Sequence, residues 1–147
     1  MFSRYIEVAA AKASSEEERE SLRAMQAAAS RLDEQERTFE ARINASKAAR
    51  GEGPTKLSKA KRREVDEYAA DAVQMADEQL QMFAALDHAR EIITALQGGL
   101  RADVRFWSKA PDMAHPSDRP VIEEFTLAKK ELLAAMSAYL KKFTGGA

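Results

Sequence analysis

The chain has 147 residues, a formal net charge of −1, no cysteine, and 45% hydrophobic and 32% charged residues. The small net charge excludes bulk attraction to nucleic acid or membranes, and the lack of cysteine excludes disulfides and thiolate metal sites. No apolar run approaches the roughly 20 residues that cross a bilayer, and the N-terminus lacks the apolar core of a secretory signal. We therefore expect one cytoplasmic domain, residues 1–147, with no membrane span.

The first predicted helix covers residues 3–50. Apolar residues recur at steps of three and four from Leu22 to Ile43, which is the spacing of a coiled-coil seam. Ser15 and Glu18 have the spacing of a capping box, which would start a new helix at that point. Because the seam continues in phase toward the N-terminus, we favour a nearly continuous helix, while a break at Ser15 stays open.

The second predicted helix covers residues 54–97. Gly51 is suited to end the first helix, and Pro54 is suited to the first turn of the second. The same steps of three and four run from Val65 to Leu100. The second helix therefore carries a seam that matches the first.

The two helices are predicted to fold back on each other as a long antiparallel coiled-coil hairpin. With the turn at Gly51, Leu32 lies opposite Ala72 and Phe39 lies opposite Val65, which pairs large residues with smaller ones. A register shifted by one heptad also fits the pattern. The predicted fold class is therefore all-α, with the register open within one heptad.

The rest of the chain predicts a connector and a third helix. Residues 98–117 contain two prolines and no sustained period, which indicates a connector. Residues 118–143 carry a wide apolar stripe, which indicates a shorter third helix. We expect this helix to pack on the base of the hairpin and to leave the distal part as a projecting arm.

The predicted hairpin tip is basic. Between Ala45 and Val65, seven Lys or Arg residues oppose two Glu residues, a local charge of +5. Such a cluster suits phosphates or an acidic protein surface, although a solvated lysine-rich hairpin end is the simpler interpretation. No aromatic residue is interleaved, which disfavours single-stranded nucleic acid. The candidate residues are Lys47, Arg50, Lys56, Lys59, Lys61, Arg62 and Arg63.

Two adjacent aromatic residues, Phe106 and Trp107, lie in the predicted connector. Aromatic side chains are enriched among interface residues that contribute most to binding. They are therefore candidate anchors for a protein partner. The simpler interpretation is that they cover the open end of the helical bundle.

The run from Phe83 to Arg90 contains His88, one of only two histidines. This run resembles the phosphoacceptor helix of histidine-kinase dimerisation domains, which are also helical hairpins. The resemblance implies phosphotransfer at His88, but the acidic residue and proline that follow the histidine in that family are missing here. An ordinary surface histidine is the favoured interpretation.

Catalytic patterns are also missing from the sequence. Neither histidine has a glutamate three residues before it, as a di-iron bundle requires, and there is no cysteine nucleophile. We expect no enzymatic activity, no metal and no cofactor. The leading prediction is a structural or adaptor protein that acts through protein–protein assembly, with homo-oligomers among the candidates. The alternative is a binder of nucleic acid or of an acidic protein surface through the basic tip, with nucleic acid less favoured.

Overall fold

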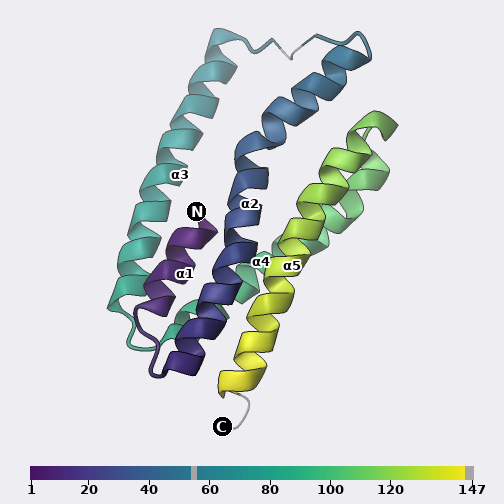
Figure 1. The fold of residues 1–147 in the computed structure, drawn as a ribbon. Helices are drawn as coiled ribbons and strands as arrows, with labels where there is room; N and C mark the ends of the chain where they lie inside the picture. The colour runs from purple at the N-terminus through teal and green to yellow at the C-terminus, as the bar shows by residue number, and fades with distance from the viewer. Residues whose placement is uncertain (54–55, 145–147) are drawn as a thin grey trace.

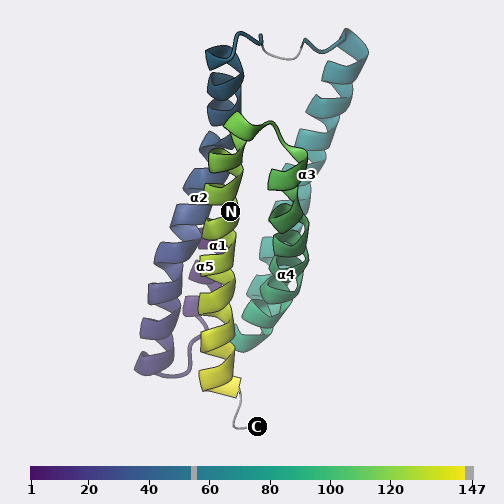
Figure 2. The same ribbon diagram turned by 90° about the vertical axis from the view of Figure 1, so that its right-hand side faces the viewer.

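Figures 1 and 2 show the computed structural model of the chain, which describes residues 1–53 and 56–144. The described residues form five α-helices and one short 3-10 helix, with no strand among them. The all-α fold class is thereby confirmed for the described part, while Pro54 lies outside it. The helices are α1 (Phe2–Ala10), α2 (Glu16–Ala49), α3 (Lys59–Ala85), α4 (Ala89–Met113) and α5 (Arg119–Thr144), and the 3-10 helix η1 (Pro116–Asp118) precedes α5.

The core lies around α5, which packs on both α2 and α4 (Figures 1 and 2). α1 folds back along α2 and also touches α4. Apolar residues from these four helices interlock and are almost fully removed from water, which is the main stabilising contribution in such a fold. The largest of them are Ile6, Leu22, Met25, Leu32, Ile92, Ile93, Leu100, Leu132, Met136 and Tyr139.

A capping box separates α1 from α2, so the favoured continuous first helix is wrong. The Ser15 side chain accepts a hydrogen bond from the Glu18 amide at 3.1 Å. Glu18 Oε2 in turn accepts hydrogen bonds from the Ser14 amide at 3.1 Å and the Ser14 hydroxyl at 2.8 Å. The break reverses the chain, so that Tyr5 and Ile6 on α1 become buried in the core. In a straight, continuous helix, Tyr5 and Ile6 would extend beyond the end of the core and would not be buried in it.

Asp33 on α2 fixes the start of α1. Its Oδ1 accepts a hydrogen bond from the Phe2 amide at 2.8 Å, and its Oδ2 accepts one from the Ser3 amide at 3.0 Å. These amides belong to the first turn of α1, where no carbonyl of the helix can pair with them. The Asp33 carboxylate thus caps α1 from a neighbouring helix and fixes its position along α2.

A second break, at Leu86–His88, divides the predicted second helix into α3 and α4. On the α3 side, Phe83 is buried and meets the Tyr5 ring edge-on, with ring centroids 5.2 Å apart. On the α4 side, the apolar face turns toward α5. Lys12 Nζ donates a hydrogen bond to the Ala84 carbonyl at 2.7 Å, which satisfies one of the carbonyls left open at the end of α3. The predicted boundary at residue 97 is therefore corrected to Ala85.

Residues 98–113 of the predicted connector are helical and belong to α4. Burial of Leu100 and packing of Val104 against the core continue the apolar period of α4 past the glycines. Pro111 lies in the last turn and cannot donate to the Trp107 carbonyl four residues earlier. That carbonyl lies 3.4 Å from the Thr126 hydroxyl of α5 instead. Tertiary burial thus outweighs the local helix-breaking signals.

The predicted coiled-coil pairing of the two long helices is not formed. Among the described residues, the only substantial helix contact of α3 is with α1, and the distal part of α3 stands apart from α2 (Figure 1). Tyr68 is 77% and Met75 is 67% exposed, although both were expected on the seam. The physical reason is that α1 and α5 already cover the apolar face of α2. The residues of this row, called here the α3 seam, are Val65, Tyr68, Ala72, Met75, Gln79 and Met82; Ala72 is half-buried and the other five are exposed.

The glycines inside α4 give a simple stability test. Gly98→Ala is expected to raise the free energy of unfolding by about 0.5–1 kcal/mol, because alanine favours a helix interior and an added Cβ would have no neighbour within 4 Å. The measurement is urea unfolding followed by circular dichroism. Gly51→Ala is the control and should destabilise the protein, since Gly51 has a φ of 82°. If Gly98→Ala does not raise the free energy of unfolding, then the chain is not helical at Gly98.

Candidate functional site

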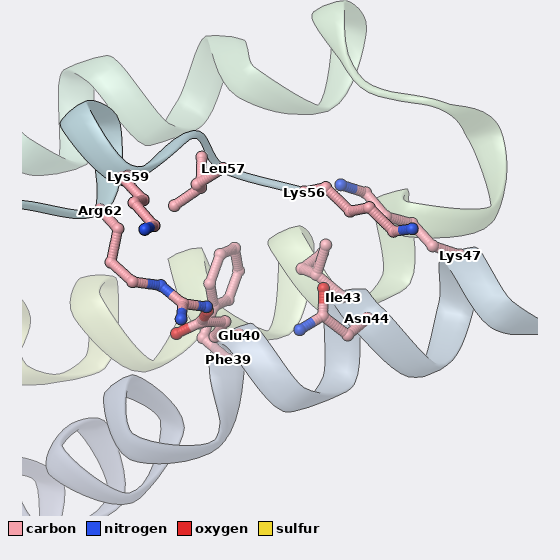
Figure 3. Close-up of a pocket in the computed structure, with 9 residues that line it drawn as sticks. All are labelled: Phe39, Glu40, Ile43, Asn44, Lys47, Lys56, Leu57, Lys59 and Arg62. Atoms are coloured by element: carbon pink, nitrogen blue, oxygen red, sulfur yellow. The ribbon is translucent and has the colours of Figure 1, made fainter. Parts of the chain in front are cut away.

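An open pocket of about 770 Å³ lies between the end of α2 and the start of α3. Figure 3 shows its side chains, which come from α2, from the connection between the two helices, and from the first turn of α3. Four cations and one carboxylate surround an apolar floor. The residues of this basic pocket are Phe39, Glu40, Ile43, Asn44, Lys47, Lys56, Leu57, Lys59 and Arg62.

The pocket combines two kinds of contact surface. It contains four positive charges, from Lys47, Lys56, Lys59 and Arg62, and one negative charge, from Glu40. Its net charge is therefore +3. Ammonium and guanidinium groups donate hydrogen bonds to carboxylates and phosphates. The apolar side chains between them suit an aliphatic or aromatic group. The arrangement can therefore hold an anionic segment that also carries apolar side chains.

Arg50 does not belong to the pocket, although the sequence placed it in the basic tip. Its guanidinium donates hydrogen bonds to Asp118 Oδ1 at 2.7 Å and Oδ2 at 3.2 Å, and its Nε lies 3.0 Å from Glu52 Oε1. The Arg50 hydrogen bonds hold the pKa of Asp118 below its usual value. Arg50 thus joins the end of α2 to η1, immediately before α5.

The two remaining cations of the predicted tip, Lys61 and Arg63, do not line the basic pocket. Lys61 Nζ lies 3.2 Å from Glu64 Oε2, an exposed ion pair of one helical turn. Arg63 lies in a shallow groove on α3 with Asp66 and Glu67, a groove that Lys59 and Arg62 also line. The structure therefore brings four of the seven predicted cations together and directs the other three elsewhere.

The predicted pair Phe106 and Trp107 is divided between surface and core. The Trp107 ring packs with Phe39 and Phe125, at centroid distances of 5.4 Å and 5.1 Å. The ammonium of Lys129, itself almost fully buried, lies 4.4 Å from the Phe125 centroid and is paired with Asp103. Phe106 meets the Trp107 ring edge-on, with ring centroids 5.8 Å apart, at the outer side of this cluster, and is 66% exposed. Phe106 is therefore the more exposed of the two predicted anchors, while Trp107 is half-buried.

His88 is exposed and lies immediately before α4, at the N-cap position. It is therefore at a helix break and not on the face of a continuous helix, where a phosphoacceptor of the resembled kind would lie. The described residues contain no group of three or more His, Cys, Asp or Glu side chains placed to bind a metal ion. Within residues 1–53 and 56–144, every helix falls short of the length and apolar character that crossing a bilayer requires.

Sequence reasoning missed an outward-facing surface on α4. Arg101, Arg105 and Lys109 are spaced one helical turn apart, are exposed, and have no ion-pair partner among the described residues. Beside them lie the exposed side chains of Phe106 and Met113. The four-residue spacing of these cations indicates that they share one side of a helix. Sequence reasoning did not use this spacing, because the nearby prolines indicated a connector and not a helix.

Comparison of the chain with known protein families, with curated proteins and with solved structures found no match.

Proposed function

We propose that this chain is a non-enzymatic structural or adaptor protein that acts through protein–protein assembly, and that the α3 seam is its assembly surface. In this proposal, the coiled-coil pattern of α3 is used between chains. The single observation that supports the proposal is the exposure of five of the six residues of the α3 seam, a heptad row on a helix of 27 residues. The remaining helices form the body that presents it.

The energetics of α3 support this interpretation. Only its last turns are packed, through Leu80 and Phe83. The part from Lys59 to Gln79 has no buried residue. An isolated helix of this length is marginal in water, because most helical stability in proteins comes from tertiary packing. Soluble proteins also seldom expose large contiguous apolar patches without a partner. A partner helix on the α3 seam would supply the missing burial.

Site-specific photo-cross-linking in the native source tests the proposal. A photoreactive residue at position 75 lies on the seam, and the same residue at the neighbouring exposed position 74 is the matched control. We expect position 75 to give discrete adducts with one protein and position 74 to give few or none. Equal adducts from both positions, or none from position 75, would contradict the proposal.

A second candidate function is binding of an acidic protein surface through the basic pocket. The observation that favours it is the grouping of four cations over an apolar floor. The apolar floor suits a protein segment that carries apolar side chains better than a nucleic acid backbone, whose sugar and phosphate groups are polar.

Charge reversal tests this second function. The triple variant Lys56→Glu, Lys59→Glu, Arg62→Glu should abolish a salt-sensitive interaction, while Arg63→Glu alone should change it little, because Arg63 does not line the pocket. The measurement is the affinity for captured partners at low and high salt. Binding that survives the triple variant would exclude the basic pocket.

A further inference from the structure

The outward surface of α4 carries its own heptad row. The exposed residues Ala95, Gly99, Ala102, Phe106, Lys109 and Met113 follow one another at steps of four and three. This is the spacing that places side chains on one side of a helix in a coiled coil. Phe106 is the largest of them, and an added Cβ at Gly99 would meet no atom within 4 Å. We call this set the α4 outer row, and nothing in the described structure covers it.

The α3 seam and the α4 outer row have opposite charges at their edges. From Glu64 to Ala85, α3 has six acidic residues and no Lys or Arg. Beside the α4 outer row lie Arg101 and Arg105 and one acidic residue, Asp112, and Lys109 lies within the row itself, so this surface is basic overall. Complementary charges of this kind steer association and disfavour wrong partners. Pairing α3 with α3 would instead bring acidic edges together.

We propose that the α3 seam of one copy docks on the α4 outer row of a second copy, and that the exchange is reciprocal in a homodimer. This inference rests on the proposed function, because it names the partner of the α3 seam. In a reciprocal dimer each copy supplies one seam and one row, so two equivalent helix pairs form around a twofold axis. The central parts of both exposed surfaces are then buried in a single assembly.

The central parts of the two rows, residues 68–79 of α3 and 95–106 of α4, fit each other in one antiparallel register. At the ends of this register Val65 lies opposite Lys109, and Met82 lies beyond the α4 outer row, opposite the buried Ile92. Tyr68 then lies opposite Phe106, so that two aromatic rings meet. Met75 lies opposite Gly99, where the missing side chain leaves space for the long thioether. At the edge of the same register, Asp71 lies beside Arg105. The like-charged pair that this register also creates, Glu64 with Asp112, lies at the solvent-exposed rim, where its cost is small.

The base of α3 explains why the occupant is a second copy and not the same chain. Phe83 and Leu80 hold the last turns of α3 against α1, and Phe83 packs edge-on against Tyr5. Closing α3 onto its own α4 would break this buried contact. A second copy can cover the seam while the contact with α1 stays intact.

Two single-cysteine variants test the docking directly, since the chain has no cysteine of its own. We mix Met75→Cys with Gly99→Cys under mild oxidation and analyse the products by non-reducing electrophoresis. A covalent dimer containing one chain of each variant is the expected product. The control mixture, Gln74→Cys with Gly99→Cys, places the first thiol off the seam and should give at least tenfold less dimer. Equal yields from both mixtures, or no dimer from the first, would overturn the proposal.

Charge reversal gives a second readout that does not depend on a thiol. Sedimentation should show that Arg105→Glu and Asp71→Arg each weaken the dimer by about tenfold, because every dimer contains the contact twice. Mixing the two variants should restore the wild-type dimer affinity, since opposite charges then meet at both contacts. A mixture as weak as the separate variants would contradict the α3–α4 contact.

The two proposals fail in different ways. If these dimers do not form but position 75 still cross-links to another protein, the homodimer is wrong and the adaptor function remains. If position 75 captures nothing at all, the assembly function itself is wrong.

Discussion

Truncating Leu32 to alanine should lower the free energy of unfolding by about 2–5 kcal/mol, whereas Met75→Ala should change it by less than about 0.5 kcal/mol. Leu32 is fully buried on α2, and its removal leaves a cavity in the core. Met75 is two-thirds exposed on α3, so its truncation in the single chain removes little buried surface. The measurement is urea unfolding at low protein concentration.

The contrast between these two variants separates the observed fold from the hairpin that the sequence pattern predicts. In that hairpin both side chains would lie in the same coiled-coil seam, and both truncations would be costly. A loss of more than about 2 kcal/mol for Met75→Ala in the monomer would therefore contradict the observed position of α3.

The second large effect is expected at the buried contact between Glu18 and Tyr139. The Tyr139 hydroxyl donates a hydrogen bond to Glu18 Oε1 at 2.7 Å, and both side chains are buried. Glu18→Ala should cost about 2–3 kcal/mol, because it leaves the hydroxyl without a partner and removes half of the capping box that starts α2. Tyr139→Phe should cost about 1–2 kcal/mol, since Glu18 keeps its hydrogen bonds from Ser14.

A double-mutant cycle isolates the Glu18–Tyr139 contact from the effects of the capping box. The two substitutions together should cost less than the sum of the separate costs, with a coupling of about 1 kcal/mol. Fully additive costs would mean that the two side chains do not interact, and hence that α5 does not contact the start of α2 as observed.

The same contact gives stability a dependence on pH. Burial alone would raise the pKa of Glu18, but the hydrogen bonds from Tyr139 and Ser14 outweigh it and lower the pKa below its usual 4.5. The folded state therefore binds a proton at Glu18 less readily than the unfolded state does. The stabilising contribution is fully present above the usual pKa and is lost as the pH falls through the lowered value. In Glu18→Gln, urea midpoints measured from about pH 6 to pH 3 should fall less steeply than in the wild type.

The sequence predicts helices well where the apolar period and burial agree. The third predicted helix, 118–143, differs from α5 by one residue at each end. The break before α2 had a sequence signal in Ser15 and Glu18, but a seam in phase across it favoured continuity. Such a seam shows only which side of a helix is apolar. A continuous helix and two helices separated by a break can both have that side apolar.

The remaining differences depend on contacts between distant parts of the chain. The break at Leu86–His88 has no glycine or proline to mark it, and it exists because Phe83 packs on Tyr5, far away in sequence. Gly98 and Pro111 are local helix breakers, yet α4 continues past both because its inner face is buried. The basic tip was visible as a charge cluster. Arg50 pairs with Asp118 and not with the pocket, because the end of α2 lies beside the start of α5. This contact between distant segments has no signal in the local sequence.

Thiol reactivity of single-cysteine variants tests whether the α3 seam is open to solvent in the single chain. Met75→Cys, on the seam, should react with a soluble thiol reagent nearly as fast as an unfolded peptide at low protein concentration, and more slowly once the chains assemble. Met25→Cys, at a position only 2% exposed, should react only when the chain unfolds. If Met75→Cys is as slow as Met25→Cys at every protein concentration, then α3 is packed on its own chain and the account is wrong.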